Sequence, residues 1–370
     1  MAIGDFATIE GTSRFKDRFE NDAAAGHFRL EQELWLSSIG IGTYLGAHDI
    51  ATDNRYEECI VRAVERGCNM IDTAANYRFQ RSERAIGRAL ESIVKSEAFG
   101  RDELVVCTKG GYLPFDGEPP ADVRRYIDET FVQTGIVEPG DIVGGSHCMT
   151  PAYLQNQIDQ SLANLNLECI DVYYIHNPES QLAGVSRAEF EARLRAAFEL
   201  LEKNIAAGKI KKYGVATWNG FRVAQGAREY HSLERIVEIA REAGGATHGF
   251  GFIQLPINLV MPEALVLRNQ TCTGETMTML EAARALRVTV VASASLLQGR
   301  VTRGIPEHMR DALGGLATDA QSGIQFVRST PGITTALIGM SRREHVDENM
   351  HLVRIAPVTP GEFERLFEER

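Results

Sequence analysis

Eight short apolar runs recur along the chain, and each is followed by a segment with helical spacing. The runs span residues 38–43, 69–73, 104–109, 170–176, 212–217, 251–255, 288–293 and 334–339. Most are rich in Val, Ile or Tyr and are apolar throughout. This pattern is typical of strands that are buried on both faces of a parallel sheet.

The segments between these runs place apolar residues on one face of a helix. The pattern is clear in residues 56–66 and again in residues 83–94. Thr150-Pro151 opens a third helix, because a cap residue is followed there by proline in the first turn. The other helices are expected over residues 190–207, 231–243, 276–286, 319–328 and 342–353.

Each predicted strand precedes a predicted helix, and no linker rich in Pro, Gly or Ser divides the chain. Eight βα units in one series predict a single closed (β/α)8 barrel, or TIM barrel, of the α/β class. A doubly wound open sheet is the alternative, but it usually has fewer strands and a Gly-rich phosphate loop after the first one. Here the turn Gly40-Ile41-Gly42-Thr43 lacks the third glycine and the helix start of the GxGxxG motif.

Two regions exceed the barrel. Residues 27–36 alternate like a β-hairpin and are expected to plug the bottom of the barrel. Residues 110–149 form a long loop after the third strand, and its aromatic residues favour an ordered segment on the substrate side. The predicted organisation is an N-terminal extension over residues 1–27, the barrel over residues 28–355 and a C-terminal helix over residues 356–370.

Composition and charge exclude several classes of protein. The 39 Lys and Arg against 50 Asp and Glu give a net charge of −11, so nucleic acid is not an expected partner. No apolar run has the roughly 18 residues of a membrane helix. Charged residues interrupt the N-terminus where a signal peptide would be apolar, which favours a cytoplasmic location. The 6 cysteines lack CxxC or zinc-ribbon spacing, so we expect reduced, mostly buried thiols and no metal site.

Polar side chains stand at the ends of three neighbouring predicted strands. Asp72 ends the second strand with Tyr77 shortly after it, Lys109 ends the third and His176 ends the fourth. Barrel enzymes place their reacting groups at the C-terminal ends of strands, so one mouth should gather these residues. A lysine ammonium lowers the pKa of a nearby phenol, and Asp72 can balance Lys109. The set predicts protonation of a carbonyl oxygen, oriented by His176, as hydride reaches its carbon.

Each of these residues also has a structural explanation when taken alone. Tyr77 could be a core or rim residue, Lys109 a solvated charge and His176 a satisfied core histidine. Asp72 could cap a turn. Their joint placement at adjacent strand ends favours the catalytic interpretation.

At these positions the sequence resembles the aldo-keto reductase superfamily. The segments IDTAANYRFQRSERAIGRAL, VVCTKGG and IDVYYIHNPE are similar to those that hold the family's Asp and Tyr, its Lys and its His. AAGKIKKYGVATWN, FIQLPINL, ASASLLQGRV and TTALIGMSRREHVDENM follow in the family's order. The resemblance spans roughly residues 28–355 and implies an NAD(P)H-dependent carbonyl reductase. It implies that Tyr77 is the general acid, that Lys109 and Asp72 tune it, and that His176 orients the carbonyl.

The resemblance also implies a cofactor site, with departures near the nicotinamide. Gln254 matches the glutamine that binds the carboxamide. Thr217 and Asn219 stand near the positions where the family usually has Ser-Asn for the same purpose. Ser293 stands where an aromatic residue stacks on the nicotinamide in many members.

The other cofactor positions that the resemblance implies contact the ribose, the pyrophosphate and the adenosine end. They are Gly42 and Thr43, then Leu296, Gly299 and Arg300, then Gly339, Ser341, Arg342, His345, Glu348 and Asn349. Arg342 lies at a predicted helix N-terminus, where free N–H groups and the helix dipole favour an anion. A guanidinium pairs well with a 2′-phosphate, so NADP(H) is favoured over NAD(H).

The resemblance places the substrate pocket above the barrel. Tyr44, Tyr112, Phe115 and Trp218 are expected to line it. The expected substrate is a small-molecule carbonyl: an aldehyde, a ketone or a sugar-derived carbonyl. No Arg or Lys cluster belongs clearly to the pocket, so neither a phosphorylated nor a strongly acidic substrate is indicated. The sequence leaves the oligomeric state open.

Two other functions stay open. Some members of the superfamily bind NADPH tightly and act mainly as regulatory or partner subunits, and the departures at Ala216 and Ser293 keep that alternative open. A barrel aldolase that forms a Schiff base on Lys109 is a weaker alternative, since it leaves Tyr77 and His176 unexplained.

Overall fold

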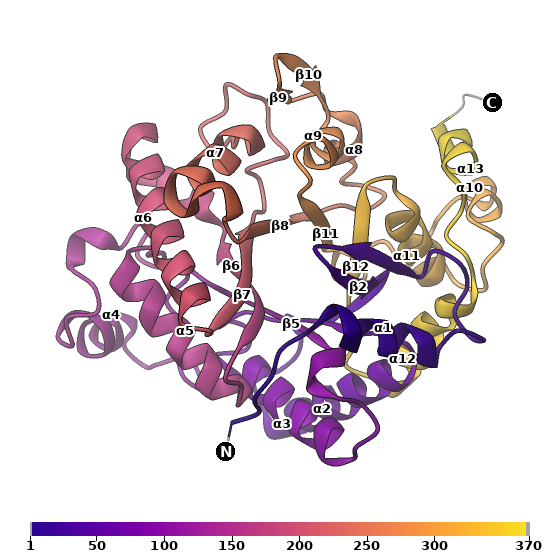
Figure 1. The fold of residues 1–370 in the computed structure, drawn as a ribbon, viewed down its shortest axis with the longest axis horizontal. Helices are drawn as coiled ribbons and strands as arrows, with labels where there is room; N and C mark the ends of the chain where they lie inside the picture. The colour runs from indigo at the N-terminus through magenta and orange to yellow at the C-terminus, as the bar shows by residue number, and fades with distance from the viewer. Residues whose placement is uncertain (1, 368–370) are drawn as a thin grey trace.

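The structure is a computed structural model that describes residues 2–367. Within these residues, eight parallel strands close into a barrel in the order β11-β12-β3-β4-β5-β6-β7-β8. The strands are β3 (Ile39–Gly42), β4 (Met70–Asp72), β5 (Val105–Gly110), β6 (Ile170–His176), β7 (Ile210–Ala216), β8 (Phe250–Pro256), β11 (Thr289–Ser293) and β12 (Ile333–Gly339). Every strand overlaps a predicted apolar run and helices surround the strands (Figure 1), which confirms the (β/α)8 barrel.

The helices that follow the barrel strands begin mostly at short polar cap residues. They are α2 (Ile50–Glu65), α3 (Arg81–Lys95), α5 (Pro151–Leu165), α6 (Arg187–Ala206), α7 (Leu233–Gly244), α9 (Met279–Ala285), α11 (Asp319–Ser329) and α12 (Arg343–Met350). Ser186, Ser232 and Thr318 accept backbone hydrogen bonds in the first turns of α6, α7 and α11. The α5 helix starts at Pro151 after Thr150, as predicted.

Alternation along the strands explains why the polar strand ends share one face. Cys107 and Tyr174 belong to a buried apolar cluster inside the barrel. Lys109 follows Cys107 by two residues on β5, and His176 follows Tyr174 by two residues on β6. Because side chains alternate along a strand, Lys109 and His176 emerge on the same interior face, one layer above the apolar core.

The N-terminal segment closes the other end of the barrel. Strands β1 (Phe28–Glu31) and β2 (Leu34–Ser37) pair antiparallel, which confirms the predicted hairpin, and Leu36 packs into the barrel interior. The preceding helix α1 (Ile9–Arg18) was not predicted; it buries Phe15 completely. This N-terminal part lies over the near end of the barrel in Figure 1.

The long segment after β5 packs onto the barrel through its aromatic residues. It contains α4 (Val123–Ile127), a π-helical turn (Asp128–Val132) and a 3-10 turn (Pro139–Asp141). The rings of Phe115 and Tyr126 lie 5.5 Å apart between centroids. Phe131 contacts Tyr153 of α5 at 5.9 Å. The segment is therefore fastened to the helix that follows it.

Several helix boundaries differ from the prediction; α2, for example, begins at Ile50 and not at residue 56. Residues Glu275–Met277 form strand β10, which pairs with β9 (Gln270–Cys272), so α9 starts only after Thr278. Thr278 and Glu281 form a capping box, and this local signal fixes the helix start more strongly than the apolar spacing. The helix predicted over residues 342–353, which follows the eighth strand, changes to a 3-10 turn at His351.

Three shorter helices complete the described chain. They are α8 (Glu263–Val266), α10 (Glu307–Ala312) and α13 (Pro360–Glu364). The last of these and a 3-10 turn (Arg365–Phe367) lie in the C-terminal helix predicted over residues 356–370, of which residues 368–370 lie outside the described part. The six cysteines are all buried. No helix within residues 2–367 has the length and apolar character that crossing a bilayer requires.

Candidate active site

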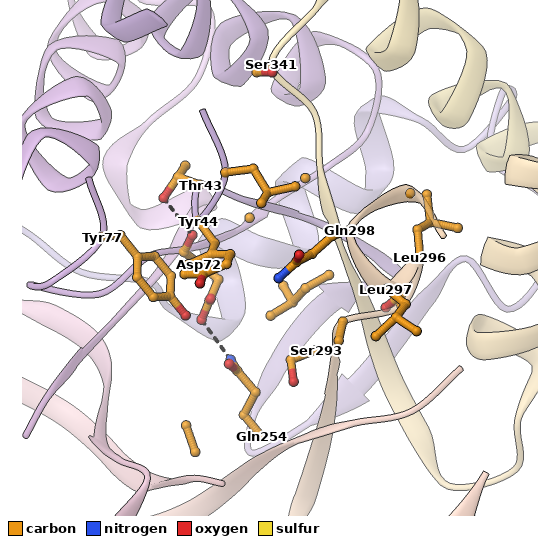
Figure 2. Close-up of a pocket in the computed structure, with 18 of the residues that line it drawn as sticks. Thr43, Tyr44, Asp72, Tyr77, Gln254, Ser293, Leu296, Leu297, Gln298 and Ser341 are labelled. Carbon is orange, nitrogen blue, oxygen red and sulfur yellow. Dashed lines mark hydrogen bonds between the residues drawn. The ribbon is translucent and has the colours of Figure 1, made fainter. Parts of the chain in front are cut away.

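A cavity of about 880 Å³ opens where the polar strand ends emerge. Asp72, Tyr77 and His176 line it together with Gln254, and Ser341 lines its part next to α12. Figure 2 shows Gln254 pointing toward Asp72 beside Tyr77, with Ser341 on the opposite side of the view. The strand ends that the sequence predicted to meet are therefore brought together at one mouth of the barrel.

Lys109 and Asp72 form a buried ion pair next to Tyr77. Lys109 Nζ lies 2.6 Å from Asp72 Oδ1 and donates a second bond of 2.6 Å to the carbonyl oxygen of Thr73. Gln254 Nε2 donates to Asp72 Oδ2 at 2.8 Å, so both carboxylate oxygens accept hydrogen bonds. Burial lowers the pKa of Lys109, but Asp72 and Tyr77 raise it by more, so the pKa lies above its usual value. Lys109 is therefore a fixed cation at neutral pH.

Tyr77 is surrounded by groups that affect its proton. Lys109 Nζ lies 5.0 Å from the Tyr77 ring centroid, and the ring centroids of His176 and Tyr44 lie at 5.8 Å and 5.0 Å. The expectation of a lowered phenol pKa is wrong for this structure: burial raises the pKa of Tyr77, and Lys109 only opposes that increase. The phenol is protonated at neutral pH and can act as a proton donor.

The backbone after Tyr77 has an unusual conformation. Residues 78–80 have φ angles of 48°, 59° and 68°, in the left-handed region that non-glycine residues rarely adopt. The Arg78 guanidinium pairs with the buried carboxylate of Asp53, and Arg81 Nη2 binds the same carboxylate at 2.6 Å. These ion pairs connect the turn to α2. They hold the backbone next to Tyr77, whose side chain lines the cavity.

His176 is a neutral imidazole beside Tyr112, with 5.1 Å between the ring centroids. Burial, and then the charge of Lys109, lower the pKa of His176 well below its usual range. Its Nδ1 is buried and has no hydrogen-bond partner within residues 2–367. Because unpaired buried N–H groups are rare, we assign the hydrogen to Nε2. Nε2–H can then donate to an oxygen atom in the cavity.

Most predicted nicotinamide and ribose residues line the same cavity. They are Gly42, Thr43, Thr217, Gln254 and Ser293. Thr43 Oγ1 lies 2.9 Å from Thr73 Oγ1, which fixes the end of β3 against the end of β4. The hydroxyl of Thr217 is buried and has no partner among the described residues. An unpaired hydroxyl in a cavity wall is available to a polar group of a ligand.

The part of the cavity that extends to α12 contains most of the residues predicted for the pyrophosphate and the adenosine end. They are Leu296, Gly299, Gly339, Ser341, His345, Glu348 and Asn349. Glu348 Oε1 accepts a hydrogen bond of 2.7 Å from Thr318 Oγ1. Asn349 Oδ1 is buried without a partner in the described chain, so it can accept a hydrogen bond from a ligand amine.

Five predicted site residues do not line the cavity within the described chain: Lys109, Phe115, Asn219, Arg300 and Arg342. Lys109 is buried and reaches the site through its ion pair with Asp72. Phe115 turns away because its ring packs against Phe79 and Tyr126. The Asn219 amide donates to Glu229 Oε2 at 3.0 Å. Arg300 and Arg342 are exposed. The other three predicted substrate residues, Tyr44, Tyr112 and Trp218, do line the cavity.

Asn177 lines the cavity and was missed by sequence analysis. Its Nδ2 donates to the Tyr112 hydroxyl at 3.1 Å. Its position directly after a polar strand end was the available signal. Leu297, Gln298 and Thr302 also line the cavity. The sequence pointed to this loop through Leu296 and Gly299, but not to these side chains, because Leu297 and Gln298 have positive φ angles that spacing does not reveal.

The family model for the aldo/keto reductase family matches residues 38–242, which is more than half of the chain and includes Asp72, Tyr77, Lys109 and His176. The chain belongs to the aldo/keto reductase family. The matched part begins at β3 and ends within α7. It therefore contains the Lys109–Asp72 ion pair and the rings of Tyr77 and His176.

Individual relatives are distant. A Schizosaccharomyces pombe protein named as an aldo-keto reductase with NADP(+) is 24% identical over 198 residues, which cover 53% of this chain and 46% of that one. A D-threo-aldose 1-dehydrogenase from a Pseudomonas species is 28% identical over 181 residues, 45% of each chain. The chain thus spans about half the length of these curated relatives. A crystal structure of an aldo/keto reductase from Klebsiella pneumoniae in complex with NADP and acetate aligns with a TM-score of 0.61 at 19% identity, covering 94% of this chain and 98% of that one.

Proposed function

We propose that the protein reduces an aldehyde or ketone to an alcohol with NADPH, or runs the reverse reaction. The observation that supports this most directly is the arrangement of Tyr77 beside Lys109, Asp72 and His176 at one end of a large cavity. Membership of the aldo/keto reductase family supports the same reaction class. The two partial matches to curated oxidoreductases are consistent with it.

The cavity has features that fit a dinucleotide. It combines a large volume with buried polar atoms that lack partners in the described chain, at Thr217 near the strand ends and at Asn349 on α12. Thr217 and Gln254 would hold the nicotinamide carboxamide, and Asn349 would accept from the adenine amine. Arg342, as N-cap of α12, and His345 would bind the 2′-phosphate. The relative named with NADP(+) and the relative crystallised with NADP support NADP(H) over NAD(H).

Bound NADPH would supply the hydride that reaches the carbonyl carbon. In our proposal the His176 Nε2–H donates to the carbonyl oxygen and orients it, while the Tyr77 hydroxyl supplies the proton. Lys109 favours the resulting tyrosinate, because a cation next to the phenol stabilises the anion. Asp72 and Gln254 keep the Lys109 ammonium in place. In the reverse direction, the tyrosinate would accept the alcohol proton.

The cavity wall favours an uncharged substrate. Among its described lining residues none is Lys or Arg, so a phosphorylated or strongly acidic substrate has no fixed cation to bind there. The rings of Tyr44 and Trp218 are exposed at the mouth. A small carbonyl compound with an apolar or ring-shaped body would pack on such rings.

The first test is NADPH oxidation by the wild-type protein with a reactive aromatic aldehyde. Tyr77→Phe should lower kcat by at least about 100-fold, because it removes the proton donor from the site. Tyr44→Phe is the matched control: it removes a neighbouring hydroxyl and should keep kcat within about tenfold of wild type. Equal activity in Tyr77→Phe and wild type would contradict the proposal.

Two other outcomes would favour the alternatives. Tight NADPH binding without turnover would favour a regulatory or partner subunit. A carbonyl compound trapped on Lys109 by borohydride would favour an aldolase. The ion pair with Asp72 speaks against the aldolase, because a Schiff base requires an accessible neutral amine and the pKa of Lys109 is raised by Asp72 and Tyr77 against the effect of burial.

A further inference from the structure

A second histidine lies directly behind His176. His147 Nε2 is 2.8 Å from the backbone carbonyl oxygen of His176, and both residues are buried. His147 stands at the end of the long segment over residues 110–149, shortly before α5. The segment therefore returns to the barrel at the strand end that presents His176.

A one-way series of hydrogen bonds fixes the tautomer of His147. Arg193 Nη1 donates to Gln181 Oε1 at 2.8 Å, and a guanidinium has no acceptor, so the Gln181 amide has one orientation. The Gln181 amide nitrogen lies 2.8 Å from His147 Nδ1, which must therefore accept. The ring hydrogen of a neutral His147 is thus on Nε2 and is donated to His176. Burial lowers the pKa of His147 to about 4, which keeps the ring neutral.

The packing around this contact leaves the His176 peptide little freedom. The Tyr112 ring lies 5.1 Å from each of the two imidazole rings, between centroids. A Cβ atom on Gly111 would come within 2.8 Å of the His176 carbonyl oxygen and 2.9 Å of His147 Nε2. On the other side, the Asn177 N–H donates to the carbonyl oxygen of Ala216 at 2.6 Å.

We propose that His147 is a positioning residue for His176, and that Arg193 and Gln181 orient it. Its N–H holds the peptide from which the His176 ring extends between Tyr77 and Tyr112. This inference rests on the proposed role of His176 toward the carbonyl oxygen. A displacement of about 1 Å in such a site can lower the rate about 100-fold.

A second buried histidine provides a matched control. His27 Nε2 lies 2.9 Å from the carbonyl oxygen of Gly67, so it makes the same kind of contact as His147. Burial lowers the pKa of His27 to about 3, so it is also neutral. It does not line the cavity and sits beside the hairpin that closes the opposite end of the barrel. Replacing His27 therefore shows how the loss of such a contact affects stability and kcat when the contact is far from the site.

The kinetic test compares His147→Ala, His147→Gln and His27→Ala well below their melting temperatures. We expect kcat to fall about 10- to 100-fold in His147→Ala, with little change in the KM for NADPH, because only the His176 geometry changes. His147→Gln should restore part of kcat, since its amide can donate. His27→Ala should lower Tm but not kcat. Unchanged kcat in His147→Ala, or equal losses in both alanine variants, would overturn the proposal.

Nitrogen NMR of histidine-labelled protein at pH 7 tests the contact without turnover. His147 should be the Nε2–H tautomer, and the ring-nitrogen shifts of His176 should change in His147→Gln but not in His27→Gln. An Nδ1–H tautomer at His147, or unmoved His176 shifts, would overturn the inference even if the protein reduces carbonyls. Failure of the wild type to oxidise NADPH would instead remove the proposed function, and these spectra would still decide whether His147 positions His176.

Discussion

At the scale of single residues, burial and neighbouring charges together set the protonation states of Lys109, Tyr77 and His176. Asp72 and Tyr77 outweigh burial and raise the pKa of Lys109. Burial raises the pKa of Tyr77, and it lowers the pKa of His176. Near neutral pH the site therefore holds the Lys109–Asp72 ion pair and two neutral donors. This is the state that reduction of a carbonyl requires at the start of the reaction.

Replacing Lys109 should separate its structural role from its chemical one. In Lys109→Met the buried Asp72 carboxylate loses its counter-ion, so the free energy of unfolding should fall by about 3 kcal/mol and kcat should fall strongly. The double variant Asp72→Asn/Lys109→Met removes both charges and should recover most of the stability but not kcat. Urea denaturation and NADPH oxidation measure the two effects. Recovery of kcat in the double variant would show that Lys109 acts only through stability.

The sequence predicted which residues meet at the site, but it did not predict the direction of every pKa shift. The pairing of Lys109 with Asp72 followed from two adjacent strand ends on one interior face. The direction of the Tyr77 pKa shift did not follow, because burial of that ring depends on several loops. Phe115 was misplaced for a similar reason. Its ring finds an apolar partner in Tyr126, and spacing from Lys109 cannot reveal that contact.

At the scale of elements, the turn over residues 78–80 stores strain beside Tyr77. Three successive left-handed residues are unfavourable without support from their surroundings. The support comes from Asp53, which binds Arg78 and Arg81, and from the Arg78 Nε that donates to Ala47 O at 2.8 Å. Gln80 Nε2 adds a bond of 3.0 Å to the carbonyl oxygen of Phe115.

Asp53→Asn should therefore lower both stability and turnover. Two arginines would lose their shared counter-ion, one of them buried, so we expect a loss of about 3 kcal/mol in the free energy of unfolding. The turn would relax and kcat should fall about tenfold. Asp347→Asn is the control, because Asp347 also binds two arginines but is exposed to 38%. Equal effects of the two substitutions would refute a special role for the turn.

The start of α12 gives a prediction about cofactor choice. Arg342 is its N-cap residue and is exposed, so its guanidinium can move toward a bound 2′-phosphate. Arg342→Ala should raise the Kd for NADPH about tenfold and leave the Kd for NADH unchanged. Fluorescence titration at fixed ionic strength measures both constants. Arg354→Ala, at an exposed arginine paired with Asp22, should change neither. Equal weakening of NADPH and NADH binding would contradict the assignment.

Elements with a strong hydrophobic period were predicted well, and those fixed by local or tertiary contacts were not. The barrel strands are apolar on both faces, so their runs are unambiguous. The helix α1 was missed although Thr8 caps it, because Phe15 is its one buried apolar side chain and the helix therefore shows no apolar face in the sequence. The hairpin β9–β10 was missed, and the helix predicted over residues 276–286 included the end of β10, since strands of three residues are too short to show alternation.

At the scale of the whole molecule, a segment with a buried, neutral histidine packs at each end of the barrel. His27 precedes the hairpin that closes one end, and His147 ends the segment that reaches the other. A third, His231, stacks on Phe190 at 5.0 Å between ring centroids. Each of these rings loses its water on folding, so its charged form is disfavoured in the native state.

This shared property predicts a fall in stability with acid. Burial lowers the pKa of His27 and His231 to about 3 and that of His147 to about 4, whereas an unfolded histidine titrates near 6.5. Between those values the unfolded chain binds more protons, so the free energy of unfolding decreases as pH falls. Each histidine contributes about 1.4 kcal/mol per pH unit below 6.5.

The urea midpoint should therefore drop between pH 7 and pH 5, and less steeply in His27→Gln, which keeps a donor for Gly67 without a titrating ring. The difference in slope between His27→Gln and wild type should approach one proton at pH 5. Parallel pH profiles for these proteins would mean that His27 is not held neutral in the folded barrel.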